Sequence, residues 1–343
     1  MRIAIAGCGF SGSYLARRLI VEGIAKPDEI ELFDPMNHRT KCGIMPCGWG
    51  ICESTLKKAA ELAQLDGDFV IESFDKVKFG NVVAKADLCC FAKPAFINAC
   101  LEGLPINRFK FPGGNFDLVV DATACRNVIR FSNATEQLWI YTRQVRLKRK
   151  DMPVERMEIV PLQQGGVGYV WKFPLKNEVH YGFGVVGGKT VDKLPSWWTS
   201  KPKWFLPDNK QRICSCKGRI RASSPKYSKP VWSRSDCCNH ATLAVGESAG
   251  MISSVTGGGC KEAIDGIEIL IKNWNDWSKY EKELIKEFEW ADREYEIVKK
   301  LYEGKKLSLK DYRTIQKNSK RVGFRLGIKE VVSLVKCILA GNG

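Results

Sequence analysis

Residues 3–12 read Ile-Ala-Ile-Ala-Gly-Cys-Gly-Phe-Ser-Gly, and their three glycines have the spacing G-x-G-x-x-G. The apolar run over residues 2–6 predicts a buried parallel strand, and the segment 13–21 predicts a helix. A second predicted strand over residues 29–33 leads directly into an acidic residue, Asp34. Strand, glycine turn, helix, strand and acid in this order are typical of a unit that binds a dinucleotide.

Each glycine of this turn has a distinct expected role. Gly7 permits the tight turn, Gly9 lets a pyrophosphate approach the backbone, and Gly12 allows helix and strand to pack closely. The start of the helix offers free N–H groups and a partial positive charge to the phosphates. Asp34 is placed to accept hydrogen bonds from an adenosine ribose. The unit alone does not distinguish FAD from NAD.

The composition is that of an ordinary folded protein. The 343 residues are 44% hydrophobic and 27% charged, which is enough to form one large core or two smaller ones. The first two residues lead directly into the first predicted strand, and the sequence has no run of about 18 apolar residues. We therefore expect a cytoplasmic protein without a leader peptide or a membrane-spanning segment.

The chain is strongly basic, with a formal net charge of +16. Basic residues gather over residues 143–150 and 201–221 and through the C-terminal third. Solvated lysines on exposed faces account for such a charge. Binding to an anionic membrane surface, a phosphorylated substrate or nucleic acid accounts for it equally. Of these partners, we expect no nucleic acid.

The fourteen cysteines form no C-x-x-C pair. A zinc site is conceivable from Cys214 and Cys216 together with Cys237, Cys238 and His240, but its spacing fits no common pattern. We expect no metal and mostly buried free thiols, with one or two disulfides left open. The three histidines form no ligand pattern, and we expect them at the surface or hydrogen-bonded in the core.

The order of predicted elements indicates an α/β protein with a β-rich insertion. Residues 1–66, 112–140 and 236–272 are predicted to form a Rossmann-like dinucleotide-binding domain. Residues 67–111 and 141–235 are predicted to form an antiparallel sheet that binds the substrate, with separate strands over 68–79, 81–86 and 88–91. Residues 273–343 are predicted to form a helical C-terminal region.

Several further motifs point to one family. They are Pro46-Cys47-Gly48-x-Gly50, Val120-Asp121-Ala122-Thr123, Tyr169-x-Trp171-x-Phe173-Pro174, Gly246-Glu247-Ser248-Ala249-Gly250 and Thr256-Gly257-Gly258-Gly259. With these motifs the chain resembles, over about residues 1–270, the geranylgeranyl reductases of the p-hydroxybenzoate hydroxylase-like FAD superfamily. It departs from the family at Glu247, where an aspartate is usual, and at Ala124, where a glycine is usual.

The resemblance implies FAD as the cofactor and assigns its contacts. It places the pyrophosphate on Gly7, Gly9, Gly12 and Ser13, the adenosine ribose on Asp34 and the adenine side near Ala122. It places Lys93 near a phosphate or the ribityl chain, and Glu247, Gly259 and Cys260 at the ribityl chain and the pyrimidine edge of the flavin. The loop that contains Cys47, Gly48 and Gly50 is expected to pass over the flavin ring.

Cys47 is the predicted catalytic residue. Reduction of an isolated C=C bond needs a hydride from reduced flavin and a proton for the other carbon, and a thiol near the ring could supply or relay that proton. The alternative is a buried, inert cysteine that only shapes the site.

Tyr169, Trp171 and Phe173 alternate along a predicted strand, so their side chains share one face. Ordinary sheet packing explains this pattern, whereas the resemblance implies an apolar wall, completed by Pro174, that receives an isoprenoid chain. Trp197, Trp198 and Trp204 could extend this wall.

The C-terminal segment 327–340 has an apolar stripe at helical spacing. The stripe consists of Ile328, Val331, Val332, Val335, Ile338 and Leu339. Such a stripe serves core packing or peripheral contact with the inner face of a membrane.

The sequence thus predicts an FAD-dependent reductase of geranylgeranyl or polyprenyl double bonds, on a lipid precursor, a quinone tail or a prenyl phosphate. We expect no second G-x-G-x-x-G unit for a nicotinamide nucleotide, so electrons would come from a transiently bound nicotinamide cofactor or a ferredoxin-like carrier. The alternatives are a flavin monooxygenase or halogenase of the same superfamily, and a non-catalytic flavin-fold protein that binds RNA or anionic lipid.

Overall fold

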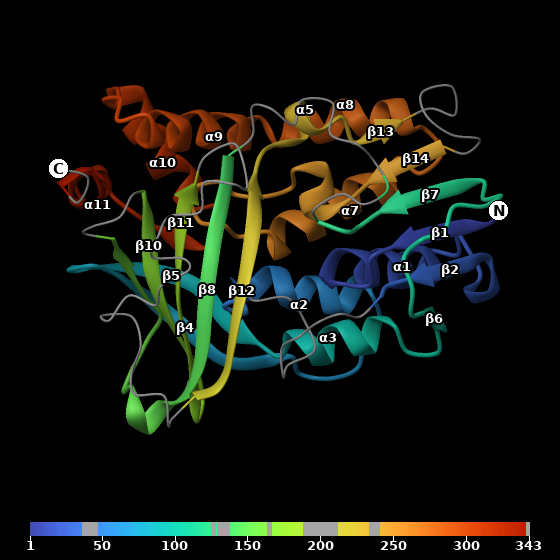
Figure 1. Ribbon diagram of the computed structural model, residues 1–343, viewed down its shortest axis with the longest axis horizontal. Helices are drawn as coiled ribbons and strands as arrows, with labels where there is room; N and C mark the ends of the chain where they lie inside the picture. The colour runs from blue at the N-terminus through green and yellow to red at the C-terminus, as the bar shows by residue number, and fades with distance from the viewer. Residues whose placement is uncertain are drawn as a thin grey trace.

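The computed structural model describes residues 1–35, 47–124, 128, 138–162, 167–187, 212–232 and 241–340. Figure 1 shows a smaller sheet with its helices near the N-terminus and a larger sheet at the other end of the molecule. The C-terminal helices extend along one side, from the smaller sheet to the larger one. The expected α/β architecture, with an antiparallel sheet inserted into a parallel one, is confirmed.

The smaller sheet has the strand order β13-β14-β7-β1-β2-β6. Its strands are β1 (Ile3–Ala6), β2 (Ile30–Phe33), β6 (Ile106–Asn107), β7 (Leu118–Asp121), β13 (Val231–Trp232) and β14 (Ala241–Ala244). β1 pairs in parallel with β2 and β7, and β14 pairs in parallel with β7. The central strands are short and apolar because both faces of the sheet are covered. Strands distant in sequence therefore end at one edge, beside the glycine turn.

The larger sheet has the order β12-β8-β11-β10-β9-β4-β5-β15, and β3 also pairs with β5. Its strands are β3 (Gly50–Cys52), β4 (Val70–Phe79), β5 (Val82–Phe91), β8 (Leu138–Lys148), β9 (Glu158–Pro161), β10 (Gly168–Leu175), β11 (Glu178–Gly187), β12 (Arg212–Ala222) and β15 (Phe324–Arg325). The prediction of separate strands over 81–86 and 88–91 was wrong, because both belong to β5. The pairing of β4 with β5 shifts register twice, and at the shift between Phe74 and Lys76 the extra residue lies on β5, at positions 86–87.

Eight α-helices of eight or more residues are described. They are α1 (Phe10–Val21), α2 (Glu53–Leu62), α3 (Lys93–Cys100), α7 (Cys260–Lys272), α8 (Trp277–Glu287), α9 (Glu289–Tyr302), α10 (Leu309–Ser319) and α11 (Ile328–Ala340). The C-terminal region is mainly helical, as predicted. None of the described helices is long and apolar enough to cross a membrane.

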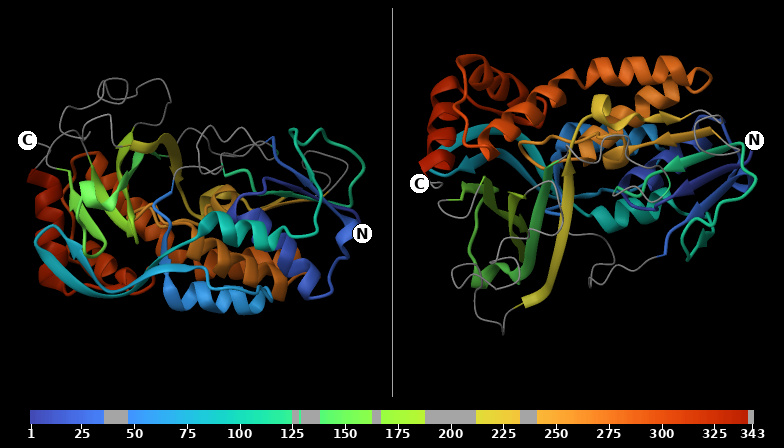
Figure 2. Two further views of the ribbon diagram at one scale, coloured as in Figure 1. Left: turned by 90° about the horizontal axis from the view of Figure 1, so that it is seen from below. Right: turned by 45° about the horizontal axis from the view of Figure 1, so that its top comes forward.

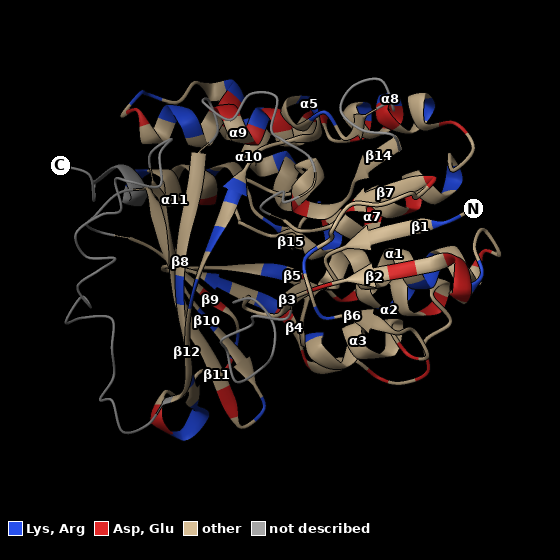
Figure 3. Ribbon diagram, turned by 45° about the vertical axis from the view of Figure 1, so that its right-hand side comes forward, with Lys and Arg blue, Asp and Glu red and all other residues tan. Residues whose placement is uncertain are grey.

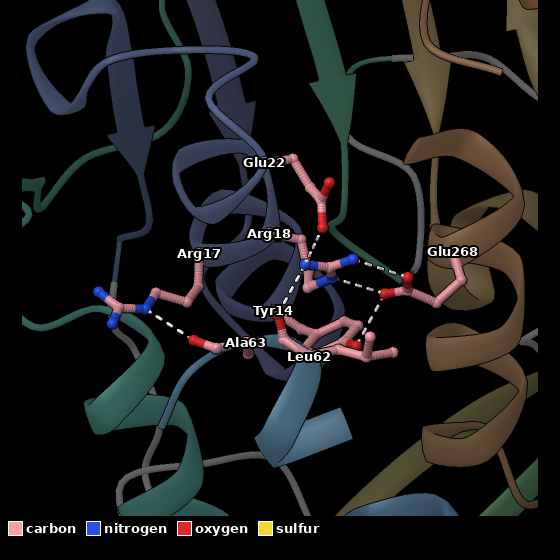
Figure 4. A network of polar contacts seen from close by, with 7 residues as sticks. All are labelled: Tyr14, Arg17, Arg18, Glu22, Leu62, Ala63 and Glu268. Carbon is pink, nitrogen blue, oxygen red and sulfur yellow. Dashed lines mark hydrogen bonds and ion pairs between the residues drawn. The ribbon is translucent and has the colours of Figure 1, made fainter. Parts of the chain in front are cut away.

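A partly buried ion pair joins the first helix of the chain to α7, 250 residues later (Figure 4). Arg18 Nε donates to Glu268 Oε1 at 2.8 Å, and the Arg18 side chain is only 3% exposed. Tyr14 Oη donates to the same carboxylate oxygen at 2.8 Å. Arg18 also donates to the carbonyl of Leu62 at the end of α2. This network fixes α1 and α7, whose N-termini both face the predicted cofactor site, relative to each other.

The bounds predicted for the three domains agree with the two sheets except at a few strands. β3, β15 and the first residues of β8 lie in the larger sheet, and β6 and β13 lie in the smaller one. The division into domains itself remains a prediction.

The apolar stripe of the tail faces inward over the part that is described. Val331 and Val335 of α11 are buried, whereas the side chains of residues 337–340 lie outside the described set. Both views in Figure 2 place the β4–β5 ribbon beside the C-terminal helices, and β15 pairs there with β5. Peripheral membrane contact therefore remains a prediction, and core packing accounts for the described part of the stripe.

Charged residues are spread over helices, strands and turns, as Figure 3 shows. In the basic run 143–150, Arg146 pairs with Glu178 and Arg149 pairs with Glu72. Arg143 is itself buried. Much of this run therefore stabilises the sheet rather than forming a free basic surface.

Candidate functional site

The three glycines of the N-terminal turn have different surroundings. Gly7 has a φ of +98°, and a Cβ there would lie 2.5 Å from the Ala122 carbonyl oxygen. A Cβ at Gly12 would lie 1.9 Å from the Gly7 oxygen, so close packing of the backbone requires this glycine. A Cβ at Gly9 would meet nothing within 4 Å. The fold therefore requires Gly7 and Gly12, whereas the open space at Gly9 is available to a ligand.

The predicted nucleoside end of the site lies beside this turn. Asp34 follows β2 and is only 8% exposed, and its Oδ2 accepts from the Cys8 backbone N–H at 2.9 Å. Ala122 follows β7 and donates its backbone N–H to the Ala6 carbonyl. Ser13 is fully buried in α1 and donates its hydroxyl to the Phe10 carbonyl. Both donors of Ser13 are thus used within the first turn of α1, because its backbone N–H donates to the Gly9 carbonyl at 3.0 Å.

The two ends of the sequence meet at this site. A Cβ at Gly246 would lie 2.1 Å from Ser11 Oγ, so the loop after β14 packs directly on the glycine turn. Ser248 Oγ donates to Asp121 Oδ1 at 3.2 Å, which connects the same loop to the end of β7.

Glu247 points from this loop toward the larger sheet. Its Oε1 accepts from the Arg221 backbone N–H at 2.9 Å, and its carbonyl accepts from the Arg221 guanidinium. Burial raises the pKa of the Glu247 carboxyl, and the Arg221 N–H and charge oppose that rise. The longer side chain that replaces the usual aspartate is thus held by a buried arginine that sequence reasoning missed.

Three predicted site residues converge from different elements. Cys47 precedes β3, Lys93 begins α3 and Cys260 begins α7. The thiols of Cys47 and Cys260 interact electrostatically with each other and with the Lys93 ammonium. Lys93 also acts electrostatically on Glu247.

The two thiols shift each other's pKa in opposite directions. Interaction with the Cys260 thiol and the charge of Lys93 hold the pKa of Cys47 well below its ordinary value, although burial opposes them. Interaction with Cys47, together with burial, holds the pKa of Cys260 well above its ordinary value. Of the two, Cys47 is therefore the thiol that ionises first.

The loop that carries Cys47 packs against Phe173 of the motif Tyr169-x-Trp171-x-Phe173-Pro174. A Cβ at Gly48 would lie 2.5 Å from the Phe173 ring, and a Cβ at Gly50 would lie 3.1 Å from it. The Cys47 loop and the strand that carries Phe173 therefore pack on each other, and the glycines make room for the ring. The side chain of Phe173 supports the loop as well as lining the space beneath it.

Polar contacts fix the same loop. Trp171 Nε1 donates to Gln144 Oε1 at 3.1 Å, and Gln144 Nε2 donates to the Cys47 carbonyl at 3.1 Å. His180 Nδ1 lies 3.2 Å from the Gly48 carbonyl, and the ring packs edge-on against Trp49. Burial lowers the pKa of His180 to about 3, so the neutral ring donates Nδ1–H to this carbonyl. His180 is thus a hydrogen-bonded core residue, as expected, but Gln144 and its link to Cys47 were missed.

A cavity of about 320 Å³ begins at the thiol pair. Cys47 and the loop Ser254–Cys260 line one end, and Tyr169, Trp171 and Phe173 line one wall. Helices α9, α10 and α11 close the far side with Ile297, Val298, Leu301, Ile315, Val331, Leu334 and Val335. Tyr169 donates its hydroxyl to the Thr256 carbonyl and so joins the wall to the loop.

Two buried carboxyl groups also line this cavity, and neither was predicted. Burial raises the pKa of Glu262 to about 8, so its side chain is mostly neutral at pH 7. Burial also raises the pKa of Glu294, whose carboxyl accepts from Ser253 and Asn318. The cavity thus remains weakly charged despite its acidic residues.

The spacing G-x-G-x-x-G does recur, at residues 182–187, but it lies inside strand β11. A Cβ at Gly182 would lie 2.3 Å from the Trp171 indole, and one at Gly187 would lie 2.2 Å from the Tyr141 ring. These glycines therefore accommodate aromatic rings and do not form a second dinucleotide-binding turn.

Some predicted residues cannot be placed. Pro46, Trp197, Trp198, Trp204, Cys237, Cys238 and His240 lie outside the described residues. Cys214 and Cys216 lie on β12, so two of the five residues considered for a zinc site are described. In the described part of the chain, no group of three His, Cys, Asp or Glu side chains could hold a metal ion.

No protein-family model and no curated protein sequence matches the chain. Several solved structures match it in fold. A geranylgeranyl bacteriochlorophyll reductase-like protein from Thermoplasma acidophilum matches with a TM-score of 0.63 and 18% identity, over 98% of this chain and 95% of that one. A flavin-dependent halogenase from Xanthomonas campestris matches with a TM-score of 0.60 and 11% identity, over 98% and 94% of the two chains.

A tryptophan 6-halogenase from Streptomyces toxytricini also matches, with a TM-score of 0.60 and 13% identity over 100% and 90% of the chains. These likenesses establish the fold over essentially the whole chain. The resemblance that the motifs indicated is confirmed at the level of that fold.

Proposed function

We propose that this protein is an FAD-dependent oxidoreductase that saturates C=C bonds of geranylgeranyl or polyprenyl chains. The observation that carries the proposal is the apolar cavity, because it begins at Cys47 and Cys260 and continues between an aromatic wall and apolar helices. A chain of isoprene units needs such a lining, since unpaired polar groups or water along it would cost binding energy. The resemblance of the fold to a geranylgeranyl reductase-like protein supports the same substrate class.

FAD fits the residues that are present. The open space at Gly9 would admit a pyrophosphate to the backbone at the start of α1, and Asp34 lies at the ribose end. Gly259 is the N-cap of α7, whose free N–H groups would face the pyrimidine edge of a flavin together with Lys93. The likeness to flavin-dependent enzymes supports this cofactor.

A bound, reduced flavin supplies a hydride. The protein must then supply a proton to the other alkene carbon and keep water away from both. Cys47 and Cys260 both line the cavity, and the charge of Lys93 favours ionisation of the Cys47 thiol. We propose that Cys260 Sγ holds the proton and that Cys47 relays it.

Tyr169, Trp171 and Phe173 would exclude water along one side of the substrate. Without a second dinucleotide-binding turn in the described chain, a nicotinamide cofactor would bind transiently, or a ferredoxin-like protein would deliver the electrons. The substrate would be drawn from a membrane, and peripheral contact of the tail with its inner face belongs to this proposal.

A flavin monooxygenase or halogenase is the second candidate, because halogenases match the fold with nearly the same TM-scores. The response of the reduced flavin to oxygen distinguishes the two candidate functions. Protein loaded with FAD is reduced without air and mixed either with a geranylgeranyl substrate or with oxygen.

The reductase predicts flavin reoxidation by the anaerobic substrate and a product heavier by 2 Da per reduced bond. Reoxidation by oxygen alone, with a hydroxylated or halogenated product and no saturated one, would support the second candidate instead.

A further inference from the structure

Glu262 places an acidic side chain in the wall of a mostly apolar cavity. It lies in the first turn of α7, is only 3% exposed and belongs to the lining of the 320 Å³ cavity. A Cβ at Gly258, which also lines the cavity, would lie 3.9 Å from Glu262 Oε2. The carboxyl group therefore lies beside the loop that leads into α7.

Glu262 differs in its hydrogen bonds from Glu294, the other acid of the lining. Glu294 accepts from Ser253 Oγ at 2.6 Å and from Asn318 Nδ2 at 3.2 Å. By contrast, the Glu262 carboxyl receives no hydrogen bond from any other residue in the part of the chain that the structure describes. A buried polar group without a partner lowers stability. Its position in a cavity therefore indicates a partner from outside the chain.

A second polar side chain of the same lining is also without a partner. Ser254 is 2% exposed, and its Oγ makes no hydrogen bond to any of the described residues. Buried polar groups of folded proteins are nearly always paired, so such exceptions in the wall of a cavity point to a ligand or to water. The two observations are independent, because one concerns a loop and the other a helix.

The protonation state of Glu262 decides which ligand fits. Burial raises the pKa of its carboxyl to about 8. At pH 7 the carboxyl therefore carries a proton most of the time, so that one oxygen donates a hydrogen bond and the other accepts one. An oxygen atom of an uncharged ligand is the matching partner, whereas a hydrocarbon offers none.

We propose that Glu262 determines the specificity of the cavity by hydrogen-bonding to an oxygen atom at the head of an isoprenoid chain. The cavity would thus prefer a chain that carries an alcohol, ether or ester oxygen to a pure hydrocarbon. This inference rests on the proposed function, because it takes an isoprenoid chain as the occupant. Binding alone tests it, without turnover.

The test compares two probes on the full chain at pH 7, farnesol and the hydrocarbon in which a hydrogen atom replaces its hydroxyl group. Binding is followed by tryptophan fluorescence, since Trp171 lines the cavity. The ratio of the two affinities should favour farnesol about 5- to 10-fold more in the wild type than in Glu262→Leu, which corresponds to one hydrogen bond. Glu262→Gln should keep most of the preference, because its amide also donates and accepts.

Asp265→Asn is the matched control, because Asp265 lies on the same helix, is partly exposed in its pair with Lys261 and does not line the cavity. This variant should keep the wild-type ratio. A second measurement needs no variant to fold. In the wild type, farnesol should shift the infrared C=O band of a protonated carboxyl, and the hydrocarbon should leave that band unchanged.

The outcomes separate this inference from the proposed function. An equal ratio in the wild type and Glu262→Leu, or a carboxyl band that farnesol does not shift, would overturn the role of Glu262 and leave the cavity as an isoprenoid site. Failure of both probes to bind would overturn the isoprenoid cavity itself, and this inference with it.

Discussion

Gly9→Ala separates the fold from cofactor binding, because the structure gives this glycine no packing role. A Cβ at Gly9 meets nothing within 4 Å, and the backbone there is extended, with φ −72° and ψ −165°, which alanine adopts freely. The added methyl group would instead occupy the space through which a pyrophosphate reaches the backbone. The variant should therefore fold normally and bind FAD poorly.

The expected magnitudes follow from two opposing effects on stability. Alanine reduces the freedom of the unfolded chain, which stabilises by about 0.4–1 kcal/mol. It is also a poorer N-cap than glycine, which costs a similar amount. The free energy of unfolding should thus change by less than about 1 kcal/mol. Loss of one hydrogen bond to a charged phosphate costs about 1.5–3 kcal/mol, so FAD affinity should fall about 10- to 100-fold.

The assay is titration of the protein with FAD by calorimetry, alongside urea unfolding. Gly12→Ala is the contrasting variant, because its Cβ would lie 1.9 Å from the Gly7 oxygen. It should lose more than about 3 kcal/mol of stability or fail to fold. A Gly9→Ala variant that binds FAD within about twofold of the wild type would refute the assigned role of Gly9.

Three further predictions concern the site and its support. Cys47→Ala should retain bound FAD and lose most alkene reduction, measured anaerobically by product mass; full activity would leave Cys47 with a packing role only. Because the folded-state pKa of His180 is lowered to about 3, its contribution to stability is complete above about pH 6.5 and is lost as the pH falls toward 3. Between pH 7 and 5, the wild type should therefore lose about 2 kcal/mol more than His180→Asn in urea unfolding, and equal losses would contradict the buried neutral ring. Arg18→Met should lower the free energy of unfolding by about 2–4 kcal/mol, because it leaves the Glu268 carboxylate without its buried partner; a loss below about 0.5 kcal/mol would match a surface pair instead.

The dinucleotide unit could be predicted from sequence because its signals are local. Glycine spacing, an apolar strand and a terminal acid occur within 34 residues, and the structure places β1, α1 and β2 there. The chain of hydrogen bonds from Trp171 through Gln144 to the Cys47 carbonyl could not be predicted, because it joins three distant segments through one side chain.

The boundary between strands also depended on tertiary contacts. Residues 81–91 looked like two strands because Lys85 and Asp87 interrupt the apolar pattern. They form one strand because β4, β3 and β15 supply hydrogen-bonding partners along its length. Likewise, the motifs suggested that Cys260 contacts the cofactor, but its interaction with Cys47 and Lys93 depends on how α7 and α3 pack.

The most direct test of the account is the flavin content of the purified protein. After incubation with FAD and removal of free cofactor, the visible absorbance spectrum should show one flavin per polypeptide, bound across the glycine turn and the start of α7. Protein that stays colourless under these conditions, while its circular dichroism shows it to be folded, would contradict a flavin enzyme.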